Sequence, residues 1–242
     1  VVHWPAGIDR GAVPQGLVSV IDLPPTILEL AGIQRPETFQ GVSLVPVLKD
    51  PVALVRDFVF AERNWHTQRY HERMVRHGDF VYIRNNLPQL TGFNIWHYQT
   101  GWQPAYSELV ERWRAGQASA AQKAVIEKPR PEEMLFNLAA DPHQLNNLAT
   151  DPRYSVQLKL LRTALDQWSE KTGDTVPELE TMTPDLNDRE TWQVIENFQK
   201  YPTGGTAWPG SETKAWAINR SGPVRKSDLQ ADTAKFPATH EK

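Results

Sequence analysis

The sequence predicts an α/β fold in which a small antiparallel sheet of about four strands is packed by a long C-terminal helix. Short β-prone runs predict the strands: residues 58–60, a hairpin over 73–85 that turns at Gly78-Asp79, and 133–138. Strands so close together in the chain favour antiparallel pairing. The helix is predicted over 152–171, where apolar residues recur at spacings of three and four and share one face. These residues are Tyr154, Leu158, Leu161, Leu165 and Trp168.

An earlier helix is predicted directly after Asp22, whose carboxylate is placed to cap the free amides of the first turn. Pro24 and Pro25 are tolerated in that first turn, and Gly32 suits the end of the helix. A cap explains Asp22 better than a metal-ligand role does. One turn of this helix is almost wholly apolar, which predicts that the helix is buried; its residues are Ile27, Leu28, Leu30 and Ala31.

The chain divides into three predicted parts. Residues 1–50 end one domain, residues 51–174 form an α+β subdomain, and residues 175–242 form an irregular arm rich in proline and glycine. Two further helices are expected inside the subdomain, at 106–115 and 119–128. The chain from Ser227 onward is expected to be disordered.

Composition excludes several functions. The net charge of -3, with basic and acidic residues interspersed, gives no electrostatic case for nucleic acid as a partner. The sequence contains no run long and apolar enough to cross a bilayer. The chain has no cysteine, so it carries no disulfide, no cysteine-ligated zinc and no cysteine nucleophile. It opens without methionine and as if within a strand, and we therefore expect a fragment of a longer protein.

The strongest candidate site follows the apolar run at 58–60, where the predicted strand gives way to a polar cluster. The candidate substrate-binding residues are Glu62, Arg63, Asn64 and His66. Arginine offers a fork of donors to an anion, histidine a donor or proton carrier near neutral pH, and asparagine both a donor and an acceptor. This set suits a sulfated or phosphorylated sugar. A solvated loop with an Arg–Glu ion pair explains the same residues equally well.

No catalytic or metal-ligating residue is predicted in this chain. The sequence lacks a phosphate-binding glycine loop, a zinc-protease motif and a nucleophile elbow. Its histidines are scattered, and His66 and His71 are five positions apart, which suits neither a strand face nor a helix face. Asp141 with His143 fits turn chemistry better than a catalytic pair.

Five segments, taken in order, resemble the C-terminal part of the type I sulfatases. They are VVHWPAGI at 1–8 (a strand followed by Trp-Pro-Gly in the family), the helix at 17–33 with its Val-Ser and Asp-x-x-Pro-Thr elements, QGVSL at 40–44, the hairpin at 73–85, and EMLFNL with the following Asp-Pro and Asn-Leu at 133–148. Residues 61–66 and the insertion at 104–116 are most similar to the heparan N-sulfatase (N-sulfoglucosamine sulfohydrolase) branch.

The resemblance implies an alkaline-phosphatase-like fold, of which residues 1–50 would close the catalytic domain. It implies hydrolysis of sulfate ester or sulfamate groups in a glycosaminoglycan-type sugar, by a formylglycine nucleophile assisted by Ca²⁺. In the family those groups lie upstream of the Trp-Pro-Gly segment, and Asp22 does not match a calcium ligand. This chain would therefore be inactive alone and would contribute substrate recognition. Its partners would be a sulfated saccharide and the missing N-terminal catalytic region, in a periplasmic, secreted or lysosomal protein.

Two other functions remain open at this stage. One is a non-catalytic module that binds glycans or proteins on a sulfatase-like scaffold. The other is part of a related phosphodiesterase or phosphonate hydrolase, because the terminal domain distinguishes leaving groups poorly.

Overall fold

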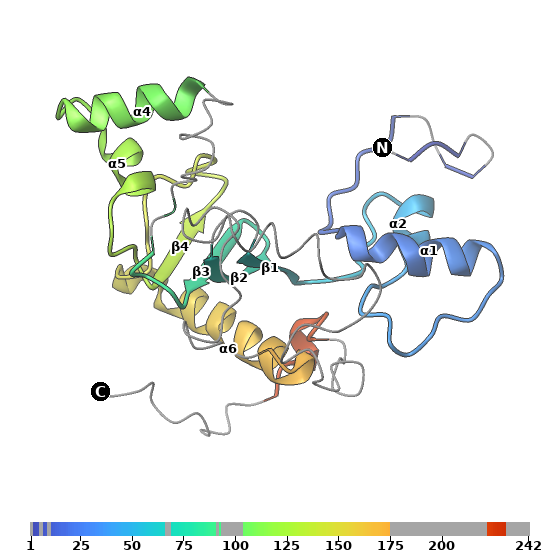
Figure 1. Ribbon diagram of the computed structural model, residues 1–242. Coiled ribbons are helices and arrows are strands. Elements are labelled where there is room, and N and C mark those ends of the chain that lie inside the picture. The colour runs from blue at the N-terminus through green and yellow to red at the C-terminus, as the bar shows by residue number, and fades with distance from the viewer. Residues whose placement is uncertain are drawn as a thin grey trace, which may run out of the picture. The chain divides into compact units, whose positions relative to one another are not determined.

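A computed structural model describes residues 2–4, 7–8, 11–65, 69–90, 92, 104–174 and 222–230 of the chain (Figure 1). These residues form two units. The first unit contains the described residues up to Val59, those of 159–174 and those of 222–230. The second unit contains the described residues from Phe60 to Leu158. No helix among the described residues is long and apolar enough to span a membrane.

The first unit is organised around the fully buried carboxylate of Asp22, which lies in the 3-10 helix η1 (Val20–Asp22) directly before helix α1 (Leu23–Leu30). The prediction that the Asp22 carboxylate caps the first turn of this helix is wrong. A capping side chain accepts from the second or third amide of its helix, and those positions are Pro24 and Pro25, which have no N–H. The carboxylate instead accepts from the backbone amides of Ser19 at 2.8 Å and Val42 at 2.9 Å, and pairs with Arg56.

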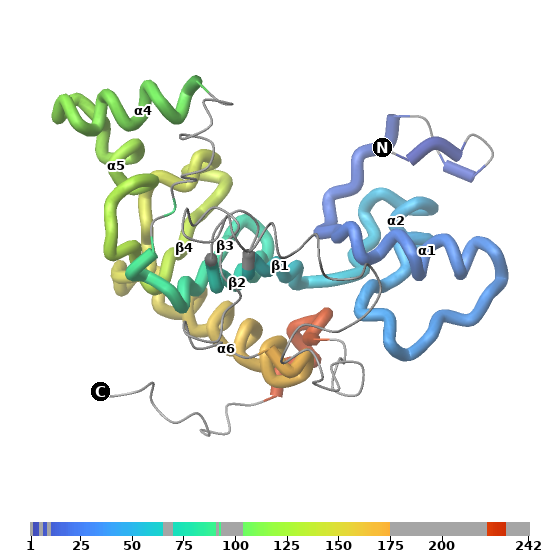
Figure 2. Tube along the Cα trace, viewed as in Figure 1, coloured from blue at the N-terminus to red at the C-terminus, as the bar shows by residue number. Residues whose placement is uncertain are grey.

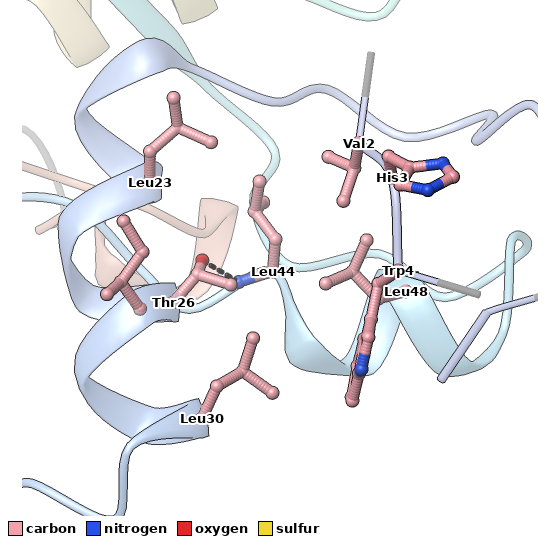
Figure 3. Close-up of a pocket in the computed structure, with 9 residues that line it drawn as sticks. Val2, His3, Trp4, Leu23, Thr26, Leu30, Leu44 and Leu48 are labelled. Carbon is pink, nitrogen blue, oxygen red and sulfur yellow. Dashed lines mark hydrogen bonds between the residues drawn. The ribbon is translucent and has the colours of Figure 1, made fainter. Parts of the chain in front are cut away.

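The buried residues of helix α1 are Pro25 and Thr26. The Thr26 hydroxyl donates to the Asp22 carbonyl at 2.5 Å and accepts from the Leu44 amide at 2.8 Å (Figure 3). This bond ties α1 to the start of helix α2 (Val45–Lys49). By contrast, Ile27 and Leu30 are exposed. The prediction that this helix is buried is therefore wrong for its apolar face, because the inward face is taken by Pro25 and by the hydrogen-bonded Thr26.

The second unit is built on a four-stranded antiparallel sheet in the order β1-β2-β3-β4, as predicted. The strands are β1 (Val59–Trp65), β2 (Arg69–His77), β3 (Phe80–Asn85) and β4 (Glu133–Asn137). The β2–β3 hairpin turns at Gly78, whose φ of 54° favours glycine. Tyr82 pairs with Val75 on one side and with Leu135 on the other, and all three are fully buried. The core of this unit therefore centres on β3.

The remaining helices lie close to their predicted positions. Helices α4 (Pro104–Arg114) and α5 (Ala120–Ile126) lie between β3 and β4, and α6 (Ser155–Thr172) follows the 3-10 turn η2 (Pro152–Tyr154). Asp151 accepts from the Arg153 amide at the start of that turn. The predicted apolar stripe of α6 is confirmed at its centre, since Leu158, Leu161 and Leu165 are buried.

Residues 222–230, which we call the clasp, contact two earlier segments of the first unit, near Asp57 and near Gln167. The Val224 carbonyl accepts from the Asp57 amide at 2.7 Å. Gln167 of α6 exchanges two hydrogen bonds with the backbone of Gln230, at 2.9 and 3.0 Å, and Figure 2 shows the red clasp beside the end of α6. The clasp contains the 3-10 helix η4 (Lys226–Asp228). The predicted disorder is therefore wrong for residues 227–230, while residues 175–221 and 231–242 of the predicted arm lie outside the described residues.

Candidate binding site on strands β1 and β2

Three of the four predicted binding residues lie within a strand and not in a loop after it. Glu62, Arg63 and Asn64 are exposed residues of β1, which is the edge strand of the sheet. Successive side chains of a strand point to opposite faces, so Arg63 lies on one face and Glu62 and Asn64 lie on the other. His66 lies outside the described residues, and its role stays a prediction. The three described residues therefore lie on the same edge strand but are divided between the two faces of the sheet.

On the first face, Arg63 is held in place by two residues of β2. Its guanidinium carbon lies 3.3 Å from the ring centroid of buried Tyr70, a cation–π contact. Its NH1 lies 3.5 Å from a carboxylate oxygen of Glu72, which also pairs with Arg130. The Arg63 side chain nevertheless remains 45% exposed. This face therefore presents an oriented, partly exposed guanidinium that can still take an anion.

On the opposite face, Glu62 lies above a buried histidine–arginine pair. Arg73 is buried, and its NH2 lies 3.8 Å from the Glu62 carboxylate and 3.0 Å from Nε2 of buried His71. A guanidinium can only donate, so Nε2 of His71 accepts and a neutral ring carries its proton on Nδ1. The Asn86 atom that lies 2.8 Å from Nδ1 is the amide nitrogen Nδ2, so the amide has to be turned by 180° for its oxygen to accept from Nδ1–H. In either orientation His71 lies between Asn86 and Arg73 and helps to position Arg73.

Sequence reasoning missed the residues that support the edge. Tyr70 and Glu72 come from the neighbouring strand, and the alternation of β2 could have indicated them once its register with β1 was known. Arg130 is 58 positions from Glu72 in the chain and lies in a proline-rich connection. No local pattern in the sequence relates these two residues.

The described residues offer no calcium site of the kind that the sulfatase resemblance implies. No group of three or more histidine, cysteine, aspartate or glutamate side chains among them could hold a metal ion. Asp22 is occupied by two amides and Arg56. Asp141 accepts from the Asn146 amide at 2.8 Å, and this backbone hydrogen bond lowers the pKa of Asp141. Asp141 therefore belongs to a turn, as predicted.

The sequence matches known sulfatases across both units. Residues 1–81, which include the β1 site residues, match the family model described as "N-sulphoglucosamine sulphohydrolase, C-terminal". The chain is 28% identical over 200 residues to an ulvan-active sulfatase of Formosa agariphila, a match that covers 81% of this chain and 33% of that protein. It is 32% identical over 178 residues to human N-sulphoglucosamine sulphohydrolase, which covers 68% of this chain and 34% of that protein.

The chain spans about a third of the length of these curated relatives. It is similar to the sulfatase family. Within that family, the part present here is similar to the C-terminal region of N-sulphoglucosamine sulphohydrolase, which confirms the resemblance seen in the sequence.

Proposed function

We propose that this chain is the C-terminal part of a sulfatase that hydrolyses sulfate ester or sulfamate groups of a glycosaminoglycan-type sugar. The sulfatase relatives support the reaction class, and the name of the human relative supports an N-sulfated glucosamine as substrate. In this proposal the chain binds the sugar. The proposal assigns the formylglycine nucleophile and Ca²⁺ to the rest of the protein, and no group of three or more histidine, cysteine, aspartate or glutamate side chains among the described residues could hold the metal.

The observation that carries the recognition role is the state of Arg63. Its cation–π contact with Tyr70 and its ion pair with Glu72 orient the guanidinium, while nearly half of the side chain remains exposed. A fixed guanidinium loses little side-chain entropy when it binds a sulfate or sulfamate oxygen. Glu62 and Asn64, exposed at the same edge, offer acceptors and donors to sugar hydroxyls.

The reaction class is tested on the complete protein to which the proposal assigns this chain. N-sulfated glucosamine, O-sulfated glucosamine, a phosphodiester and a phosphonate monoester are offered separately, and released sulfate or phosphorus product is measured. We expect sulfate release from a sulfated sugar. Turnover of the phosphorus substrates alone would overturn the proposal and assign the chain to a related hydrolase.

The recognition role is tested by Arg63→Ala in the same protein. We expect KM for the sulfated sugar to rise about tenfold, which corresponds to the loss of ~1.4 kcal/mol of binding. Arg63→Lys should recover only part of this loss, because a lysine lacks the planar fork. Arg112→Ala is the matched control, since Arg112 is a half-exposed arginine that pairs with Glu108 on α4.

Thermal unfolding separates recognition from support of the fold. The Arg63→Ala melting temperature should stay close to that of the unchanged protein, because Arg63 is nearly half exposed and Glu72 keeps its ion pair with Arg130. An unchanged KM together with a large fall in melting temperature would show that Arg63 is structural.

A further inference from the structure

Glu72 of strand β2 is shared between two arginines. Its Oε1 pairs with Arg130, and its Oε2 lies 3.5 Å from a guanidinium nitrogen of Arg63. The Glu72 and Arg130 side chains are mostly buried, at 12% and 15% exposed, whereas that of Arg63 is 45% exposed. Two guanidiniums and one carboxylate leave one positive charge in excess. The more exposed of the two cations is Arg63, so an external anion can approach the excess charge there.

Arg130 is held in place by contacts that do not involve Arg63. Its backbone amide donates to the Pro88 carbonyl at 2.8 Å. Its side chain passes over Gly92, where an added Cβ would lie 3.1 Å from the Arg130 Nε. From this position the guanidinium donates to Oε1 of Glu72. Arg130 can therefore keep Glu72 paired when Arg63 turns to a ligand.

Arg63 is held less tightly by Glu72 than by its aromatic neighbour. The 3.5 Å separation from Oε2 is longer than the ~2.7–3.2 Å of an N–H···O hydrogen bond. The guanidinium carbon also lies 3.3 Å from the ring centroid of buried Tyr70, a contact that does not depend on Glu72. Arg63 can thus exchange the Glu72 carboxylate for another oxyanion while Tyr70 still orients it. The exchange is favourable only if Glu72 stays paired, because an unpaired and mostly buried carboxylate is strongly destabilising.

We infer that Arg130 is a positioning residue for anion binding, which makes the Arg63 guanidinium available to an anionic group of the sugar by keeping Glu72 paired. This inference rests on the proposed function, in which Arg63 binds the sulfated sugar. Without Arg130, only Arg63 would remain of the two arginines that pair with Glu72. The sugar would then have to displace this carboxylate from its remaining arginine. Arg130 therefore raises the affinity for the sugar by acting through Glu72 and Arg63.

The first test removes the charge of Arg130 from the complete protein. Arg130→Gln should raise KM for N-sulfated glucosamine about fivefold and leave kcat unchanged, because binding is weakened equally in the ground and transition states. Arg130→Lys should stay close to the unchanged protein, since lysine keeps a positive charge beside Glu72. Arg112→Gln is the matched control, because Arg112 pairs with Glu108 on α4. An unchanged KM in Arg130→Gln would overturn the inference.

The second test adds Glu72→Gln to Arg130→Gln and separates positioning from support of the fold. The second substitution removes the carboxylate that competes for Arg63, so KM should return close to that of the unchanged protein, a non-additive result. A purely structural role for Arg130 predicts no recovery, because the second substitution removes a further ion pair. A double variant whose KM stays as high as that of Arg130→Gln would overturn the inference.

Repeating these measurements with the phosphodiester and the phosphonate monoester distinguishes the inference from the proposed function. Loss and recovery of binding on a phosphorus substrate alone would reject the sulfatase proposal and leave the role of Arg130 standing. A raised KM in Arg63→Ala, without loss and recovery in the Arg130 variants, would reject the role of Arg130 alone. An Arg63→Ala variant with an unchanged KM for every substrate would overturn both this inference and the recognition role.

Discussion

Two buried arginines, one in each unit, are paired in different ways. Arg56 of the first unit pairs with Asp22, and both side chains are almost completely removed from water, at 4% and 0% exposed. Arg73 of the second unit is equally buried, at 3%, but its carboxylate partner Glu62 is 54% exposed and lies 3.8 Å away. The first pair is closed to solvent, and the second joins the interior to the surface.

The difference shows what each pair contributes. A buried charge whose only carboxylate is removed costs several kcal/mol, because nothing in the interior replaces that partner. An exposed carboxylate is already screened by water, so its removal costs little. The Asp22 pair therefore supports the fold. The Glu62 pair leaves the exposed carboxylate available to a ligand, and the buried His71 positions Arg73 beneath it.

The sharpest test makes the same chemical change in both pairs. Asp22→Asn should lower the free energy of unfolding by ~3–5 kcal/mol, because the charge of Arg56 is left buried and uncompensated. Glu62→Gln should lower it by at most ~1 kcal/mol. Denaturant unfolding of both variants measures the two values. Equal losses of unfolding free energy would show that burial of the carboxylate does not determine how much each ion pair contributes to stability.

A third arginine provides an intermediate case. Arg225 of the clasp has a side chain 38% exposed and lies 3.3 Å from the Asp57 carboxylate. Arg225→Ala should cost ~1 kcal/mol and accelerate hydrogen exchange at the amides of Asp57 and Phe58, both of which donate to the Val224 carbonyl. Lys226→Ala is the matched control, because Lys226 reaches Asp57 through its backbone amide. If Lys226→Ala lowered the stability and accelerated exchange as much as Arg225→Ala, the Arg225 side chain would not be what holds the clasp.

A buried group that stays neutral extends the comparison to high pH. Burial, together with the hydrogen bond that its hydroxyl donates to Glu133 at 2.5 Å, raises the pKa of Tyr82 to about 12 against the opposing influence of Arg84. Because the folded-state pKa exceeds the ordinary value of 10.0, the contribution to stability is complete below pH 10 and is lost as pH rises toward 12.

The corresponding variant is Tyr82→Phe. The free energy of unfolding should fall less steeply between pH 10 and 12 in this variant than in the unchanged protein. Absorbance titration of the folded protein at alkaline pH should lose one late component. A phenol that titrates at its ordinary pKa would contradict this account of the interior.

The sheet and the later helices could be predicted because each follows from local pattern. Gly78 indicates the turn of the β2–β3 hairpin, and leucines at helical spacing indicate the buried face of α6. The role of Asp22 could not be predicted, since its partners Val42 and Arg56 are distant in the chain. The apolar pattern of α1 predicted burial of that face, and the prediction is wrong there, because Ile27 and Leu30 are exposed.

The candidate site was predictable as a set of residue types and not as a geometry. Glu62, Arg63 and Asn64 were identified from their chemistry, yet the strand continues through them and divides them between two faces. Tyr70 and Arg130 determine how Arg63 and Glu72 are held, and neither lies near the cluster by any periodic rule.

The clasp affects the order in which parts of the protein can fold during synthesis. Lys226 binds Asp57 across 169 positions of sequence. At about 5–20 residues per second, a ribosome needs roughly 8 to 34 s to make that length of chain. The amides of Asp57 and Phe58 therefore lack their acceptor, the Val224 carbonyl, for that time, although the strand that follows them can form much sooner. During synthesis, the segment leading into β1 is among the last parts of the first unit to be completed.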